Sequence, residues 1–161
     1  MKLRAKGEYK LQVLDNGLVI AERKYTNLIT TEGADLLWDV MFGGAAASDP
    51  WYIGLIGSTP TPSVAITDTL ASTPGWDELI PGTDYTGNRQ EWVEAAASSR
   101  TKTSSANAVF PILTTKTVWG SFLCDVATGT AGTLFSAGAF SVAVPVVAGN
   151  TVNVVFSVQL A

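Results

Sequence analysis

Histidine is absent from all 161 residues of this sequence. It is the commonest general base near neutral pH, the usual partner of a catalytic serine or cysteine and the commonest metal ligand. Its absence excludes most hydrolase mechanisms. The sequence also has no Gly-x-Gly-x-x-Gly segment and no Gly-Lys-Ser/Thr phosphate loop. We therefore expect a protein that is not an enzyme and that holds no cofactor or metal ion.

Cysteine is nearly absent, since Cys124 is the only one. A single cysteine excludes an internal disulfide, so stability must come from packing or from association with other subunits. Cys124 ends the apolar run 120–124 and has no cationic neighbour in the sequence. This setting favours a small buried side chain over a nucleophile.

Charge is also scarce, because only 15% of the residues are charged against roughly 25% in an average soluble domain. No apolar run approaches the ~20 residues that cross a bilayer, and the basic N-terminus leads into an alternating stretch rather than an apolar signal segment. We expect no membrane partner and no export by a signal peptide. The spare apolar surface should instead contact protein.

The few cations gather at the N-terminus, where six of them face only three carboxylates. This part carries +3, and the rest of the chain carries −7 of the net charge of −4. With a pI near 4.6 and no concentrated basic face, we do not expect nucleic acid as a partner. We interpret the cations as an interface that clamps an acidic neighbouring subunit; they are Lys2, Arg4, Lys6, Lys10, Arg23 and Lys24.

Hydrophobic periodicity predicts a mainly all-β fold. Asp15-Asn16-Gly17 between two apolar runs predicts a tight hairpin within residues 9–21, and a helix is expected at about 31–42, where Thr30 or Thr31 can act as the N-cap. Residues 151–160 alternate apolar and polar side chains, as a strand lining a core does.

Seven or eight short strands separated by turn signals favour an antiparallel β-sandwich, with a jelly roll left open. We divide the chain into a basic hairpin or arm, residues 1–26, and a β-sandwich domain, residues 27–161.

The polar middle of the chain, residues 67–104, contains the remaining candidates for a site. Its carboxylates could form a glycosidase pair or a calcium site, but their spacing favours a solvated acidic face; they are Asp77, Glu78, Asp84, Glu91 and Glu94. Trp76 and Trp92 lie beside these acids. Either ring could fill the core, or it could be an exposed interface anchor or part of a sugar platform.

Several blocks in the last two thirds of the chain resemble, in the same order, a family of small structural proteins of tailed bacteriophages. The blocks are Trp-Tyr-Ile-Gly-Leu-Ile at 51–56, Asp-Thr-Leu-Ala at 68–71, Gly-Trp-Asp-Glu at 75–78 and Gly-Thr-Leu-Phe-Ser-Ala-Gly-Ala-Phe at 132–140. Val-Ala-Gly-Asn-Thr at 147–151 precedes the closing strand. No single block is specific; their order carries the resemblance.

The resemblance implies a virion component assembled in the cytoplasm of the bacterial host. We expect a capsid decoration or cement protein, a homotrimer that binds the major capsid protein of the same phage and stabilises the assembled shell. Two alternatives remain: a tail, collar or fibre component whose loops contact a host glycan, and a carbohydrate-binding module.

Overall fold

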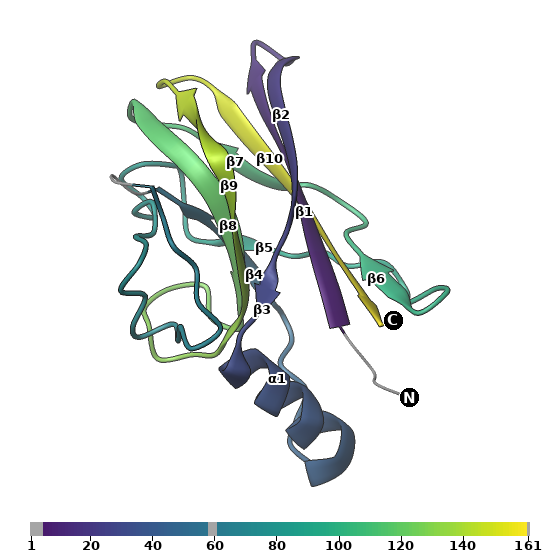
Figure 1. Ribbon diagram of the computed structural model, residues 1–161. Coiled ribbons are helices and arrows are strands. Elements are labelled where there is room, and N and C mark those ends of the chain that lie inside the picture. Colours follow the sequence, from purple (N-terminus) through teal and green to yellow (C-terminus); the bar gives the residue numbers. More distant parts are fainter. Residues whose placement is uncertain (1–4, 58–60, 161) are drawn as a thin grey trace.

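The computed structural model describes residues 5–57 and 61–160 of the chain. Within them, two antiparallel sheets pack face to face, and one short α-helix hangs below their lower end (Figure 1). The predicted all-β sandwich with an N-terminal hairpin and a short helix is confirmed.

The first sheet is built around the last strand of the chain. β10 (Thr151–Leu160) pairs along one edge with β1 (Ala5–Asp15), which pairs in turn with β2 (Leu18–Thr26). Along its other edge β10 pairs with the short strands β6 (Thr101–Thr103) and β7 (Ala108–Pro111).

The second sheet has the order β3, β9, β8, β4, β5. Its centre is the hairpin of β8 (Lys116–Cys124) and β9 (Leu134–Val146), flanked by β3 (Leu28–Ile29), β4 (Tyr52–Ile56) and β5 (Gln90–Glu91). The chain passes from the first sheet to the second between β2 and β3, at Asn27.

The main core lies between the sheets and follows from alternation along the strands. In β1 every second side chain is apolar, and Tyr9 stands opposite Phe156 of β10 in the register. Both are fully buried, and their rings lie 4.8 Å apart. The Tyr9 hydroxyl then crosses the core to Ser136 Oγ of β9, 2.9 Å away, so the two sheets are joined by a polar contact as well as by packing.

The hairpin of residues 1–26, which the sequence analysis treats as an arm beside the sandwich, is built into the first sheet over its described residues. β1 lies between β2 and β10 and pairs with β10 over ten positions, from Ala5 opposite Leu160 to Leu14 opposite Thr151. The physical reason is that its alternate apolar side chains complete the core face that β10 begins. Only the turn and the start of β2 extend beyond the other strands (Figure 1).

The polar middle of the chain covers the outer face of the second sheet. β8 is buried on both faces, so Phe122 points away from the main core into a smaller apolar cluster with Trp76 and Leu70. Gly54 of β4 leaves space for the Phe122 ring, because an added methyl group there would lie 2.2 Å from the ring. The long-loop region is thus packed against the sheet.

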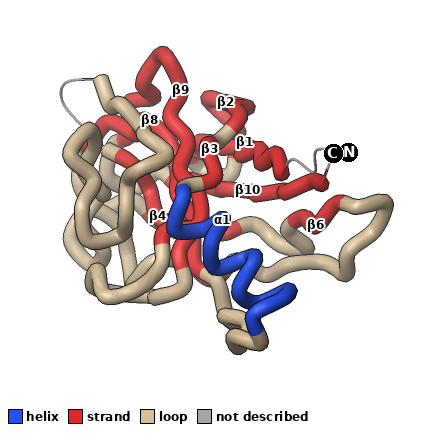
Figure 2. The backbone as a smooth tube through the Cα atoms, turned by 60° about the horizontal axis from the view of Figure 1, so that its bottom comes forward, coloured by secondary structure: helices blue, strands red, loops and turns tan. Residues whose placement is uncertain are grey.

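The predicted helix at 31–42 is present as α1 (Thr31–Trp38), continued by a turn of π-helix, η1 (Asp39–Gly43). Gly44, with φ of +75°, ends it. Seen from below, α1 lies at the end of the sandwich where β1 begins and β10 ends (Figure 2).

Candidate functional site

The predicted basic interface does not form one free cationic patch. Lys2 and Arg4 lie outside the described residues. Lys10 and Lys24 stand opposite each other on the outer face of β1 and β2, and each is paired diagonally with a carboxylate. Lys10 lies 3.2 Å from Glu22, and Lys24 lies 2.9 Å from Glu8.

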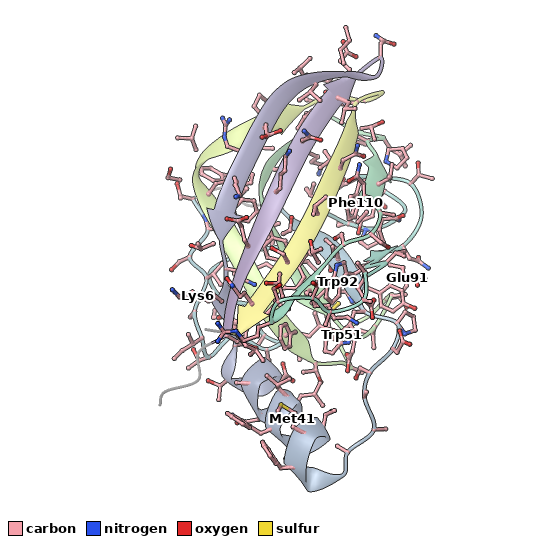
Figure 3. All side chains as sticks on the ribbon, turned by 90° about the vertical axis from the view of Figure 1, so that its right-hand side faces the viewer. Lys6, Met41, Trp51, Glu91, Trp92 and Phe110 are labelled. Carbon is pink, nitrogen blue, oxygen red and sulfur yellow. The ribbon has the colours of Figure 1, made fainter. Side chains whose placement is uncertain are left out.

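The two other described cations of this set point elsewhere. Arg23 stands opposite the buried Leu11 on the core side of β2 and donates to the Glu22 carbonyl oxygen. Lys6 is exposed near the lower end of β1, away from the hairpin turn (Figure 3). Sequence reasoning missed the neutralising pairs because they depend on strand register.

Trp76 and Trp92 are buried, so of the roles that the sequence left open, core packing is confirmed and the exposed interface anchor is wrong for both. Trp76 donates from Nε1 to Asp68 Oδ2 at 2.8 Å, and Trp92 donates from Nε1 to Ser104 Oγ at 2.9 Å. The Trp92 ring packs edge-on against Phe156 in the main core. Neither ring is free to stack on a sugar or to anchor a partner, because each is packed in the core with its N–H satisfied.

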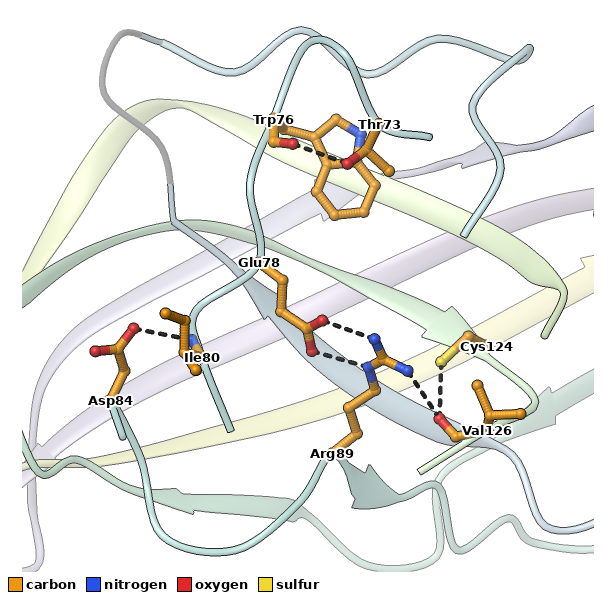
Figure 4. A network of polar contacts seen from close by, with 8 residues as sticks. All are labelled: Thr73, Trp76, Glu78, Ile80, Asp84, Arg89, Cys124 and Val126. Atoms are coloured by element: carbon orange, nitrogen blue, oxygen red, sulfur yellow. Dashed lines mark hydrogen bonds and ion pairs between the residues drawn. The ribbon is translucent and has the colours of Figure 1, made fainter. Parts of the chain in front are cut away.

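The polar middle of the chain is held in place by a buried ion pair between Glu78 and Arg89 (Figure 4). Two parallel hydrogen bonds of 2.8 and 2.7 Å join the carboxylate to the guanidinium, which also donates to the Val126 carbonyl oxygen. The Arg89 guanidinium lies over the Phe122 ring, 5.3 Å from its centroid. This pair ties the middle segment to the end of β8.

Two of the other candidate carboxylates also serve the fold, whereas Asp77 and Glu91 are exposed. Asp84 accepts from the Ile80 backbone N–H and is paired with Lys116, and Glu94 is paired with Lys102. No group of three or more His, Cys, Asp or Glu side chains that could hold a metal ion occurs in the described residues. Burial raises the pKa of the Cys124 thiol to about 11, so this cysteine is a poor nucleophile at neutral pH.

The most exposed aromatic side chains lie on the helical segment. Phe42 is 76% exposed and Trp38 is 47% exposed, and their rings stack 5.6 Å apart. The exposed carboxylates Asp35 and Asp39 precede Trp38 and Phe42 by three residues each. We name this outer face of the segment, Asp35, Trp38, Asp39 and Phe42, the helical knob.

The start of the helix is fixed to the sandwich by hydrogen bonds and close packing. Thr30 caps the helix, with its Oγ1 accepting from Gly33 N at 3.0 Å and donating to the Leu134 carbonyl oxygen. Glu32 accepts from Leu134 N at 3.0 Å. Gly33 packs so closely on β9 that an added Cβ would lie 2.3 Å from the Phe135 carbonyl oxygen.

Beside the knob lies an apolar hollow of about 460 Å³ between the helix and the ends of the strands. A second hollow of about 280 Å³ shares Ala5, Leu37 and Leu160 with it and adds Arg100 and Lys102. We name the two together the end groove; Lys6, Ile29, Ala34, Trp38 and Met41 line its first part.

A separate apolar surface lies at the opposite end of the molecule, on the hairpin turn. Leu18 is 73% exposed, and Val19 and Ile20 beside it are also exposed. We name these three residues the hairpin tip; Figure 1 shows that it extends beyond the other strands.

Sequence reasoning missed both apolar ends. The signal for the knob was present, because Trp38 and Phe42 are four residues apart and alternate with Asp35 and Asp39 on one helical face.

None of the helices among the described residues has the length and apolar character needed to cross a membrane. Comparison with known proteins found no family model and no curated protein that matches this chain.

Proposed function

We propose that this chain is a structural protein of a tailed-bacteriophage particle, assembled in the bacterial cytoplasm, and that it acts as a capsid decoration or cement protein. It performs no catalysis; it works by binding other protein subunits. The observation that carries the proposal is a sandwich with exposed apolar side chains at two opposite ends. A protein that bridges two subunits needs two such surfaces.

The ion pairs made by the candidate carboxylates support a structural role for this chain. The carboxylates raised as catalytic candidates include three that are engaged in ion pairs with Arg89, Lys116 and Lys102. Most of the blocks that carry the phage resemblance fall on β4, on the loop that holds the buried Trp76 and on β9. The resemblance therefore concerns the scaffold, and the binding surfaces are inferred from exposure.

The hairpin tip is our candidate for the contact with the major capsid protein. Leu18, Val19 and Ile20 lie at the end of a two-stranded projection, where they can enter a depression on a neighbouring surface. The charged pairs behind the tip are already neutralised, so desolvating this part of the hairpin costs less than burying free lysines. In place of the basic clamp expected from the sequence, the proposed contact is the apolar hairpin tip, with the paired charges of β1 and β2 beside it.

Stabilisation follows from linkage. A protein that binds only the assembled lattice stabilises that state by its binding free energy, about 2.7 kcal/mol per site at a free concentration ~100 times Kd. Three copies joined as a homotrimer would engage neighbouring capsid subunits together, which raises the effective affinity of each contact.

The test mixes purified protein with phage shells that lack it and images the mixture by cryo-electron microscopy. We expect ordered density at junctions of the shell lattice and a higher rupture temperature. Leu18→Ser should reduce occupancy, because it removes the most exposed side chain of the tip. Ile80→Ser is the control, because it removes an exposed apolar side chain outside both the hairpin tip and the helical knob.

Density on the tail or collar instead of the shell would replace the cement role with the tail station. Particles that stay bare at every station would overturn the proposal as a whole.

A further inference from the structure

The helical segment presents two different faces at the lower end of the molecule. Ala34, Leu37 and Met41 line the end groove, whereas Asp35, Asp39 and Phe42 lie on the adjoining outer face. Trp38 lies at the boundary and stacks on Phe42. A projecting aromatic face and an apolar groove are therefore side by side on one molecule, as a knob and a socket.

The charges around these two surfaces are opposite in sign. The segment 31–43 contains Glu32, Asp35 and Asp39 and no lysine or arginine. The end groove is flanked by cations: Lys6 lines its first part, and Arg100 and Lys102 line its second part. Lys102 forms an ion pair with Glu94, while Lys6 and Arg100 are exposed.

We propose that the helical knob of one copy occupies the end groove of a second copy. Trp38 and Phe42 would meet the apolar lining, and Asp35 and Asp39 would face Lys6 and Arg100 of the neighbour. The occupant is a second copy of this chain because the knob matches the groove both in apolar character and in charge. The contact concerns the chain alone and does not depend on the proposed docking on a shell.

The contact is taken as head-to-tail, with each copy's knob in the next copy's groove, in keeping with the homotrimer expected from the sequence; two copies that exchanged knobs about a two-fold axis would give a closed dimer instead. A head-to-tail contact leaves one knob and one groove open in a pair and is satisfied throughout only when a ring closes. A ring of three copies would form the homotrimer expected above, with the hairpin tips pointing away from the contacts.

The first experiment measures the mass of the purified full chain by sedimentation over a range of concentrations. We expect self-association that Phe42→Ser weakens by at least about tenfold, since buried aromatic anchors dominate such contacts. Leu18→Ser is the matched control, because it removes an equally exposed apolar side chain at the other end and should leave the mass unchanged. Both variants should keep the unfolding midpoint of the parent.

The second experiment reverses the charges. Asp39→Lys and Lys6→Glu should each weaken association, and the two changes combined in one chain should restore it, because each interface then carries the pair in reverse. A mixture of Phe42→Ser with a groove-filling Ala34→Phe chain should stop at one-to-one pairs, since only one knob and one groove remain usable.

Two results would overturn the inference. One is a parent chain that sediments as a monomer at about 100 µM, a concentration at which even a weak specific contact is populated. The other is an oligomer that neither Phe42→Ser nor the charge reversals affect. Loss of self-association with intact shell binding, or the converse, separates this inference from the proposed function.

Discussion

At the scale of single residues, buried charges in this protein are used for structure. The Arg89 side chain is 3% exposed and Glu78 is 22% exposed, so removing one partner leaves the other with an incompletely solvated charge. Burial by itself lowers the pKa of Arg89, and the hydrogen bonds with Glu78 more than offset it, so the pKa is raised and the guanidinium stays charged.

We predict that Glu78→Gln lowers the free energy of unfolding by about 3 kcal/mol, because it leaves the Arg89 charge buried without a counterion. Urea denaturation of both chains measures the difference. Lys102→Met, which breaks the more exposed pair with Glu94, should cost less than about 1 kcal/mol. Equal losses in the two variants would contradict a special role for the buried pair.

Asp84 should give the protein part of its acid sensitivity. Burial alone would raise the pKa of this carboxyl, but the Ile80 N–H, Lys116 and Thr114 together hold it below its ordinary value of 3.8. A carboxyl with a depressed pKa in the folded state contributes stability above its unfolded pKa, and this contribution is lost as the pH falls through the folded pKa.

Asp84→Asn should therefore lower the free energy of unfolding by about 2 kcal/mol at pH 7, and the gap should close as the pH falls below 3.8. Unfolding curves at several pH values check this. A gap that stays constant down to the most acidic pH would show that the charge of Asp84 contributes nothing.

At the scale of elements, the helix shows how a contact can outweigh intrinsic propensity. In an isolated helix, replacing glycine with alanine stabilises by about 1 kcal/mol. At Gly33 the added methyl group would lie 2.3 Å from the Phe135 carbonyl oxygen of β9, which cannot move without breaking the sheet.

We predict that Gly33→Ala destabilises the protein and loosens α1 from the sandwich, detectable as faster amide hydrogen exchange in the helix. Gly43→Ala is the control, because the nearest atom to its added Cβ is Asp39 Oδ1 at 3.4 Å and the change should be tolerated. If Gly33→Ala proved as stable as the parent, the close packing on β9 would be disproved.

The two faces of β10 should contribute differently to stability. Phe156 is fully buried between Tyr9 and Trp92, while the adjacent Val155 lies on the outer face of the first sheet. Phe156→Ala should cost about 4 kcal/mol through lost burial and a cavity, whereas Val155→Ala should cost less than about 1 kcal/mol. Thermal and urea unfolding give both values, and a reversed order would contradict the register of β10.

At the scale of the whole molecule, the described part of the N-terminal hairpin shares a sheet with the rest of the sandwich. β1 is an inner strand of the first sheet and contributes Tyr9, Leu11 and Val13 to the core. Without it, β10 would expose an unpaired edge and an open core face.

A chain of residues 27–161 should therefore fail to fold, seen as loss of the strand signal in circular dichroism and of a cooperative unfolding transition. The same signals from the full chain are the control. A truncated chain that unfolds cooperatively would restore the view of residues 1–26 as a separate arm.

Local pattern was enough for much of the fold. The Asp15-Asn16-Gly17 turn, the capped helix and the alternating strand at 151–160 were predicted because turn chemistry, capping and periodicity act over a few residues. The strands β3 and β6 were not predicted, because two and three residues are too few to show a hydrophobic periodicity. They form only against β9 and β10.

The sequence by itself determined that this is an all-β chain poor in charge, with neither histidine nor a disulfide. Only the tertiary structure decided that Trp76 and Trp92 are buried, that Lys10 and Lys24 are paired, and that apolar side chains remain exposed at two opposite ends. The physical reason is range: periodicity is set by neighbours along the chain, whereas burial and charge pairing are set by residues that meet only when the two sheets pack.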